Sequence, residues 1–339
     1  MAHVTRSRQG SPLAVLLILA LSACGSSGSG ATDIATTDPG TVADVVEADV
    51  PIVEVVDQDA APDAPDADIP WGADARGYVS LRGIVHLHSL YSDGQAEAAT
   101  MIARVRALAL PEAGISDHLV PVALDDGFGT PYDRLGEYMA AARAEAAASP
   151  SPLLVGLEID YSPETLEEVR GLLELHRPDY VIGSIHFVHG FAHDLPDGLD
   201  GYAGSTRDLW LSYYELLSGL ARARVCDVLG HADLVKKFGR LPARDAVVVR
   251  AARSALKLAA RNGMAIELNT AGWRDPVGEQ YPSLPLLAYA RELGMPLTFG
   301  SDAHAPDTVA YEFSLAVRIA RAAGYVTWLR LSDRRQVPL

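Results

Sequence analysis

The segment GIVHLHSLYSDG, residues 83–94, contains the pattern on which the predicted fold depends. Its apolar start is short enough for a buried strand, and His86 and His88 lie two positions apart at the end of that strand. Alternate residues of a strand face the same side, so both imidazoles point in one direction. Asp93 follows in a Ser-Asp-Gly turn. This pattern predicts a strand with metal-capable side chains at its carboxyl end.

Seven short apolar runs, each followed by a stretch of helical periodicity, organise the chain from this segment onward. The predicted strands are residues 83–87, 112–116, 153–157, 180–185, 225–230, 265–268 and 297–299. The predicted helices are residues 96–109, 132–148, 163–175, 206–222, 244–262, 283–293 and 308–323. Strands that alternate with helices form a parallel sheet. We therefore predict an α/β fold, a closed TIM-like (β/α)7 barrel with its functional groups at the carboxyl ends of the strands.

Ligand-type residues follow five of the other six predicted strands. They are His118, Glu158, His186, His231, Asp302 and His304. Together with His86, His88 and Asp93, they bring six imidazoles and three carboxylates to one rim of the barrel. Such groups repel one another or remain unsatisfied unless cations neutralise them. The sequence therefore predicts a metal site.

Nine ligands, one of them bridging, suit three divalent metal ions with water completing each coordination sphere. Mixed imidazole and carboxylate donors favour zinc, manganese or iron over magnesium or calcium, and the spacing does not choose among the three. Each residue alone has a simpler explanation, because a lone histidine near a strand end is commonly structural and a lone aspartate after a serine often caps a helix. The convergence of all nine favours metal binding.

The first 24 residues resemble a lipoprotein signal peptide. Arg6 and Arg8 precede the apolar stretch 13–21, and small residues lead to Cys24. The sequence LSACG, residues 21–25, resembles a bacterial lipobox, so we expect a lipid anchor on Cys24 and export to the cell envelope. A glycine after the cysteine favours the outer membrane. The alternative is an ordinary cleaved signal with a coincidental cysteine.

Residues 25–74 are rich in Ala, Asp and Pro, with twelve acidic residues and no Lys or Arg. They cannot bury enough apolar surface to offset their ordering entropy, so we predict a disordered linker before a domain at residues 75–339. Most of the formal net charge of −16 lies in this linker, and no basic surface suggests nucleic acid as a partner. Cys226 is expected to be a buried apolar side chain. The oligomeric state stays open.

Several motifs resemble the PHP (polymerase and histidinol phosphatase) superfamily. HLHSLYSDG (residues 86–94) and ISDH (115–118) resemble its first two motifs, and the segments around Glu158, His186, His231 and Asp302 are similar to the rest. Further segments resemble the histidinol-phosphate phosphatase branch. They are GLEIDY (156–161), GSIHF (183–187), GHADLVKKF (230–238), ELNTAG (267–272) and RDPVGE (274–279). The similarity extends from about residue 83 to residue 325.

This resemblance implies a distorted seven-stranded barrel with a trinuclear metal site. The first metal would be held by His86, His88, Glu158 and Asp302. Glu158 would bridge to a second metal held by His186 and His231. The third would be held by Asp93, His118 and His304. The resemblance also implies a phosphatase in which a metal-bound hydroxide attacks a small phosphate monoester, with Glu158 and Asp302 as catalytic residues.

Arg274 is the candidate clamp for the phosphate group, since a planar guanidinium suits paired phosphate oxygens. An equally good interpretation is a surface ion pair with Asp275 or Glu279. The other candidates for substrate binding are Lys236, Lys237 and His189. His189 and His193 lie in a loop where an exposed histidine is the simpler interpretation. Phe238 and Trp273 are candidates for the pocket wall, although aromatic residues commonly serve packing alone.

Three other functions remain open at this stage. The first is a phosphodiesterase, nuclease or nucleotide phosphatase on the same scaffold. The second is an amidohydrolase, a class that commonly bridges its metals with a modified lysine where Glu158 stands here. The third is a non-catalytic surface binding protein. An exported enzyme would not meet the histidinol phosphate of a cytoplasmic pathway, so the physiological substrate is left open.

Overall fold

The computed structural model describes residues 83–124, 127–242 and 245–339, and all of them belong to one compact unit. The predicted signal peptide with Cys24 and the predicted linker, residues 25–74, lie outside the described residues. Within the described ranges, no helix combines the length and the apolar character needed to cross a membrane.

The seven predicted helices are confirmed, each within five residues of its expected bounds. They are α1 (Ala98–Ala107), α2 (Leu135–Ala147), α3 (Leu166–His176), α4 (Thr206–Ala223), α5 (Ala246–Arg261), α6 (Leu284–Glu292) and α7 (Phe313–Ala322). The start of α4 is fixed by a capping box between Ser205 and Asp208. The start of α7 differs most from expectation, at residue 313 instead of residue 308. The short 3-10 helix η4 (Pro306–Thr308) ends there, and the next residue, Val309, has an extended backbone.

The described residues contain eight short parallel strands, and seven of them overlap six of the seven predicted strands. They are β1 (Ala113–Ile115), β2 (His118–Leu119), β3 (Leu153–Val155), β4 (Leu157–Asp160), β5 (Val181–Ser184), β8 (Val228–Leu229), β9 (Ala265–Asn269) and β10 (Leu297–Gly300). One sheet has the order β10-β9-β8-β5-β4-β2, and β1 pairs with β3. The predicted strand at residues 153–157 is divided at Gly156 into β3 and β4, and β2 lies beyond the end of the strand predicted at residues 112–116.

The segment at residues 84–88 closes the barrel between β1 and β10. Ile84 forms a parallel bridge with Ala113 of β1, and Leu87 forms one with Ala303. Val85 N also donates to the carbonyl oxygen of Phe299 in β10 at 3.0 Å. The first predicted strand is therefore present as isolated bridges, and these contacts join the β1–β3 pair to β10, at one end of the six-stranded sheet. This confirms the predicted α/β barrel.

Two hairpins and two 3-10 helices were not predicted, and a third 3-10 helix, η1 (Tyr132–Arg134), forms the start of the helix predicted at residues 132–148. The elements not predicted are β6 (Phe187–Val188) with β7 (Phe191–Ala192), β11 (Thr327–Arg330) with β12 (Arg335–Pro338), η2 (Leu234–Lys236) and η3 (Ala271–Trp273). The β6–β7 hairpin, η2 and η3 follow β5, β8 and β9, so each lies beside the carboxyl end of a barrel strand.

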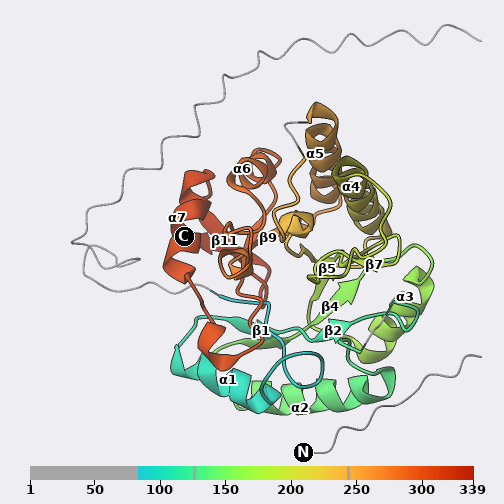
Figure 1. The fold of residues 1–339 in the computed structure, drawn as a ribbon. Helices are drawn as coiled ribbons and strands as arrows, with labels where there is room; N and C mark the ends of the chain where they lie inside the picture. The colour runs from blue at the N-terminus through green and yellow to red at the C-terminus, as the bar shows by residue number, and fades with distance from the viewer. Residues whose placement is uncertain (1–82, 125–126, 243–244) are drawn as a thin grey trace, which may run out of the picture. The chain divides into compact units, whose positions relative to one another are not determined.

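Figure 1 shows the helices arranged outside the strands. The largest apolar cluster joins side chains of both. Cys226 packs against this cluster as a partly buried free thiol, rather than as the fully buried residue expected. A second cluster consists of Val85, Tyr180, Ile182, Val228, Ala265 and Leu331. Because several of these residues lie at or near strand starts, this cluster fills the barrel at the amino ends of the strands.

Tyr180 fits this end of the barrel only because two neighbouring strands carry glycine. Its side chain is fully buried, and its hydroxyl group donates to the carbonyl oxygen of Val85. A Cβ atom on Gly114 would lie 2.3 Å from Tyr180 Oη, and one on Gly156 would lie 2.5 Å from the ring. Real Cβ contacts are not that short, so both positions require glycine for packing.

We expect Gly156→Ala to lower the free energy of unfolding by about 1–3 kcal/mol, because the added methyl group overpacks the site against Tyr180. Urea denaturation monitored by circular dichroism measures the change. Gly136→Ala is the control, since Gly136 is a residue of α2 where an added Cβ has no neighbour within 4 Å. That variant should gain roughly 0.5–1 kcal/mol. Equal effects of the two substitutions would contradict the packing argument.

Candidate metal centre

The nine residues predicted as metal ligands lie together at the carboxyl ends of the strands, and we call them the ligand cluster. Its members are His86, His88, Asp93, His118, Glu158, His186, His231, Asp302 and His304. They come from the closing segment, the turn after it, β2, β4 and the residues that follow β5, β8 and β10. Residues separated by more than 200 positions in the sequence therefore contact one another, as the barrel predicts.

Glu158 occupies the centre of the ligand cluster, and its side chain is almost completely buried. Its Oε2 atom lies 3.0 Å from His86 Nε2 and 3.0 Å from His118 Nδ1. Its Oε1 atom lies 2.9 Å from His231 Nε2 and 3.7 Å from His186 Nε2. Imidazole nitrogens therefore approach both carboxylate oxygens, which is the arrangement expected of a bridging ligand.

Asp302 and Asp93 provide the other two carboxylates. Asp302 Oδ1 lies 3.1 Å from His88 Nε2, and the residue has a left-handed backbone, with φ of 51°. Asp93 Oδ2 lies 3.2 Å from His304 Nε2, and its Oδ1 lies 3.6 Å from His118 Nε2. The side chains of Asp93 and His304 are each 32% exposed. This side of the ligand cluster is therefore the one open to solvent.

Ligand atoms within 4.8 Å of one another form four overlapping groups in the cluster. These are His88, Asp93, His118 and His304; His86, His88 and Glu158; His86, His231 and Asp302; and His118, Glu158 and His186. The groups agree with the implied arrangement in joining Asp93 to His118 and His304. They differ in that His231 groups with His86 and Asp302 instead of with His186, and in that His88 and His118 each belong to two groups, so both imidazoles lie between neighbouring positions.

The donor atoms of the cluster fit divalent cations. His86 Nε2, both ring nitrogens of His88 and Glu158 Oε2 are buried and have no hydrogen-bond partner among the described residues. Buried polar atoms without partners are costly, and the Nε2 atoms of His86 and His88 lie 3.0 and 3.5 Å from Glu158 Oε2. Imidazoles mixed with carboxylates suit zinc, manganese or iron. The chemistry of the donor set therefore favours a transition metal.

Burial and carboxylates act in opposite directions on the imidazoles. Burial opposes a proton on His186, but Asp160 and Glu158 raise its pKa to about 10. Burial likewise opposes a proton on His118, but Glu158 raises its pKa to about 9. Burial lowers the pKa of His88 to about 3. The carboxylates therefore favour protonated imidazoles at His118 and His186, and protons compete with metal ions for the cluster.

Two carboxylates that the sequence did not indicate orient imidazoles of the cluster. They contact the Nδ1 atoms of His86 and His186, whose Nε2 atoms face Glu158. Glu267 Oε1 lies 2.7 Å from His86 Nδ1, and Glu267 Oε2 accepts a hydrogen bond from His231 N at 2.8 Å. Asp160 Oδ2 lies 2.9 Å from His186 Nδ1. Such contacts fix the tautomer and orientation of a metal-binding imidazole. Glu267 belongs to β9, the one strand for which no ligand was predicted, and Asp160 shares a face of β4 with Glu158.

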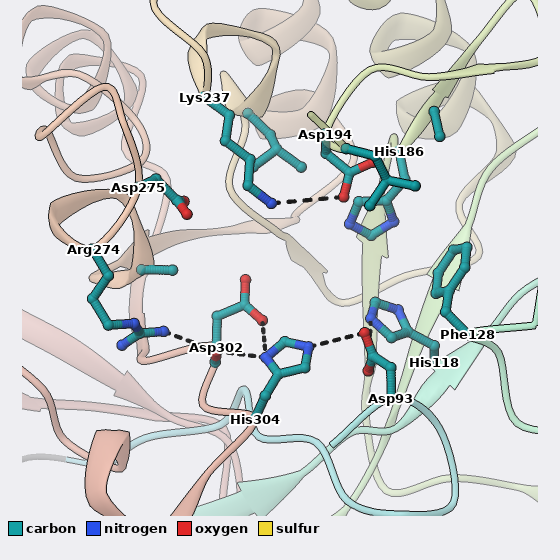
Figure 2. A pocket seen from close by; sticks show the side chains of 14 residues that line it. Asp93, His118, Phe128, His186, Asp194, Lys237, Arg274, Asp275, Asp302 and His304 are labelled. Atoms are coloured by element: carbon teal, nitrogen blue, oxygen red, sulfur yellow. Dashed lines mark hydrogen bonds and ion pairs between the residues drawn. The ribbon is translucent and has the colours of Figure 1, made fainter. Parts of the chain in front are cut away.

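A pocket of about 250 Å³ lies beside the ligand cluster. Figure 2 shows Asp93, Asp302 and His304 on one side and Lys237 on the opposite side. Lys237 Nζ lies 3.9 Å from the Asp194 carboxylate, the closest approach of these two charged side chains. The sequence identified Lys237 as a pocket residue but gave no indication of Asp194. The pocket therefore has a cation-binding side and a side with paired charges.

Arg274 lines this pocket, as predicted for a residue that contacts phosphate. Its Nη2 donates to the carbonyl oxygens of Ser301 and Asp302 at 2.9 and 3.0 Å, and its guanidinium lies over the Tyr311 ring, 5.1 Å from the centroid. These contacts hold the guanidinium beside the ligand cluster. The alternative ion-pair partner Glu279 contacts Lys236 instead.

The structure corrects the prediction for Lys236. Its side chain is buried, and its Nζ donates to Glu279 Oε2 at 2.7 Å and to the Gln280 carbonyl oxygen at 2.8 Å, with Asp233 Oδ2 at 3.0 Å. These three contacts account for the three N–H donors of the ammonium group. Lys236 therefore binds residues 279–280 and does not line the pocket.

His189 also lies away from the pocket at the ligand cluster. It lines a second pocket, where its Nε2 is 2.8 Å from Ser212 Oγ, so the structure does not bring it to the predicted substrate site. His193 is buried, and its Nε2 donates to the Ile185 carbonyl oxygen. Phe238 and Trp273 were candidates for the pocket wall, but neither lines the pocket at the cluster. The phenylalanine that lines it is Phe128.

A family model described as PHP domain matches residues 85–271, a range that ends before Asp302 and His304. The protein named "Probable histidinol-phosphatase" of Deinococcus radiodurans is 38% identical over 237 residues, which are 67% of this chain and 89% of that protein. The histidinol-phosphatase of Bacillus subtilis is 31% identical over 175 residues, which are 47% of this chain and 65% of that protein.

Two solved structures share the fold. One, described as a histidinol phosphatase of Listeria monocytogenes, has a TM-score of 0.63 at 21% identity and covers 69% of this chain and 99% of its own. The other, a histidinol phosphate phosphatase of Lactococcus lactis complexed with zinc, L-histidinol and phosphate, has a TM-score of 0.60 at 21% identity. It covers 72% of this chain and 94% of its own.

We expect Glu267→Gln to weaken the binding of divalent cations by about 10–100-fold. The oxygen of the new amide would have to accept from His231 N, so its NH2 group would face His86 Nδ1. That contact forces the ring proton onto Nε2, the nitrogen that faces Glu158. Zinc titration in competition with a chromogenic chelator measures the affinity.

Glu279→Gln is the matched control, because Glu279 contacts Lys236 outside the ligand cluster. This variant should bind zinc as the unmodified protein does. Equal zinc affinity in the Glu267 variant and this control would show that Glu267 does not orient His86.

Proposed function

The chain belongs to the PHP domain family, and from this premise we propose that it hydrolyses a small phosphate monoester with three divalent cations held by the ligand cluster. Its chemistry is that of a metal-dependent phosphoesterase of the histidinol-phosphatase type. The number of cations and their identity as zinc, manganese or iron belong to the proposal. The observation that carries it is Glu158, whose two oxygens each lie beside imidazoles from different strands.

The cluster offers three positions for cations in this proposal. The first is bounded by His86, His88, Glu158 Oε2 and Asp302, the second by Glu158 Oε1, His186 and His231, and the third by Asp93, His118 and His304. Bound cations would supply positive charge to phosphate oxygens and lower the pKa of a bound water. Glu158 would contribute to catalysis by bridging the first two positions, and Asp302 by helping to hold the first.

Arg274 and the open side of the cluster determine how a phosphate group would bind. Asp93 and His304 are the exposed members of the cluster, so the substrate enters on their side. Arg274 is already held beside Asp302 by two backbone carbonyl oxygens and by Tyr311. We therefore assign Arg274 to the phosphate oxygens that face away from the cations. Lys237 faces the same pocket and is assigned to the rest of the substrate.

A small phosphorylated compound fits the volume of the pocket and the relatives. The relatives from D. radiodurans and B. subtilis are named histidinol-phosphatases, and the L. lactis structure was solved with L-histidinol and phosphate. We propose a phosphate monoester of similar size as the substrate. The export signal predicted for residues 1–24 separates this enzyme from a cytoplasmic pathway, so the alcohol attached to the phosphate is expected to differ.

We expect the purified protein, loaded with zinc or manganese, to release phosphate from p-nitrophenyl phosphate and from histidinol phosphate. Glu158→Gln and His231→Ala should lower kcat/KM by at least about 1,000-fold, because they remove several kcal/mol of electrostatic stabilisation, at about 1.4 kcal/mol per factor of ten.

Arg274→Ala should lower kcat/KM by about 10–100-fold with metal content unchanged, because the lost contact is with substrate. Phosphate release and metal content are measured in parallel.

The Lys257→Ala variant is the control, since Lys257 lies on α5 and does not line the pocket. Its activity should be that of the unmodified protein. Full turnover by the Glu158 and His231 variants would overturn the proposal. Faster hydrolysis of bis(p-nitrophenyl) phosphate than of the monoester would replace it with a phosphodiesterase.

We also propose that the enzyme is exported and anchored to the bacterial cell envelope, with the outer membrane favoured. The support is the sequence of residues 1–24, in which Cys24 follows an apolar stretch at the lipobox position. The acidic residues 25–74 would then be a tether, and the catalytic domain would begin near residue 75. A tether of this length lets the domain stay clear of the lipid surface.

We expect the full-length protein, expressed in a Gram-negative host, to incorporate labelled palmitate and to fractionate with membranes. Cys24→Ser should abolish the label, because the thiol is the attachment point of the lipid. Cys226→Ser is the control and should retain it, since that thiol packs against the core. Palmitate incorporation that persists in the Cys24 variant would contradict the anchor.

A further inference from the structure

Asp117 is a fully buried residue between β1 and β2, directly before the cluster member His118. Its backbone is part of the barrel. The N–H group donates to Tyr138 Oη at 3.3 Å, and the carbonyl oxygen accepts from Glu158 N at 3.1 Å. The side chain of Asp117 therefore extends from a fixed point of the barrel wall. Asp117 belongs to none of the groups of candidate metal ligands among the described residues.

The Asp117 carboxylate binds the turn that precedes Asp93. Its Oδ1 accepts from Ser89 N at 2.7 Å, from Ser92 Oγ at 2.5 Å and from Ser92 N at 3.2 Å. Its Oδ2 accepts from Ser89 Oγ at 2.8 Å. Two serines thus give four hydrogen bonds to one buried carboxylate. Because a buried charge is costly without such donors, the carboxylate and the turn fix each other in place.

The turn itself leaves Asp93 little freedom. Ser92 N and Gly94 N both donate to the Ser89 carbonyl oxygen, at 3.0 and 2.9 Å. A Cβ atom on Gly94 would lie 2.6 Å from Ser89 N, so the chain is tightly folded at this point. Asp93 lies between Ser92 and Gly94 and is held from both sides. Its Oδ2 thereby stays 3.2 Å from His304 Nε2.

Asp93 takes part in a single group of ligand atoms, the one formed with His88, His118 and His304. We propose that Asp117 is a positioning residue that places Asp93 and so determines whether the solvent-facing cation position is filled. This inference rests on the proposed function, because it requires that the ligand cluster holds cations. It adds that one position depends on a carboxylate that binds no cation itself, whereas the two positions around Glu158 do not depend on the 89–94 turn.

The test compares zinc retention in Ser92→Ala, Ser92→Thr and Asp117→Asn with that in the unmodified protein. Each protein is loaded with zinc, dialysed against graded chelator concentrations and measured by elemental analysis. Ser92→Ala and Asp117→Asn should lose one equivalent at a chelator concentration about 10–100-fold lower, with the other equivalents unchanged. Ser92→Thr keeps the hydroxyl group and should retain zinc normally. Ser92 is only partly buried, so its variants test the proposal even if Asp117→Asn does not fold.

Ser162→Ala is the matched control, because the Ser162 hydroxyl also donates to a carboxylate beside a barrel strand, that of Glu164, outside the cluster. It should retain every equivalent. The inference is overturned if Ser92→Ala and Asp117→Asn keep the full zinc content at every chelator concentration, or if they lose all equivalents together. If the unmodified protein itself binds no stoichiometric zinc, manganese or iron, the proposed function fails as well.

Discussion

The buried carboxylate of Glu158 is the group on which the rest of the site depends. Moving a carboxylate from water into a protein interior costs several kcal/mol unless positive charge accompanies it. Imidazoles approach both Glu158 oxygens, and the Ser184 hydroxyl group donates to Oε1 at 2.5 Å; these groups are neutral unless an imidazole binds a proton. Positive charge must therefore arrive from outside the side chains, as protons or as metal ions. The barrel stabilises a site that is complete only when such charge is present.

The barrel meets this requirement by using its two ends differently. Parallel strands place all their carboxyl ends at one rim, so imidazoles from four other segments, the closing segment, β2 and the residues that follow β5 and β8, reach Glu158 without long loops. At the amino end, Tyr180 and its apolar neighbours fill the interior and keep the strands in register. β9 contributes no member of the ligand cluster, but its Glu267 orients both His86 and His231. Ligands held by strands and supported from behind are more accurately placed than ligands held by loops alone.

The sequence predicted the features that depend on local pattern. Helices, strands and the nine cluster residues follow from periodicity and from position at strand ends. The role of Glu267 did not follow, because its partner His86 is 181 positions away and only the closed barrel brings them together. Lys236 was misassigned for a related reason, since a lysine in a polar segment is normally exposed and only tertiary contacts bury this one. The β6–β7 hairpin was missed because strands of two residues have no periodicity to detect.

Strands and loops contribute different parts of the chemistry. The ligand cluster is fixed by strand ends, and cations bound there act on a phosphate group whichever alcohol carries it. The rest of the pocket lining comes from segments that follow β2, β8 and β9, where Phe128, Lys237 and Arg274 lie. Discrimination between substrates arises from contacts that differ between them, and the cations contact the part that all phosphate monoesters share. Under the proposed function, the cluster and Arg274 therefore act on the phosphate group, and side chains such as Lys237 and Phe128 are left to distinguish one alcohol from another.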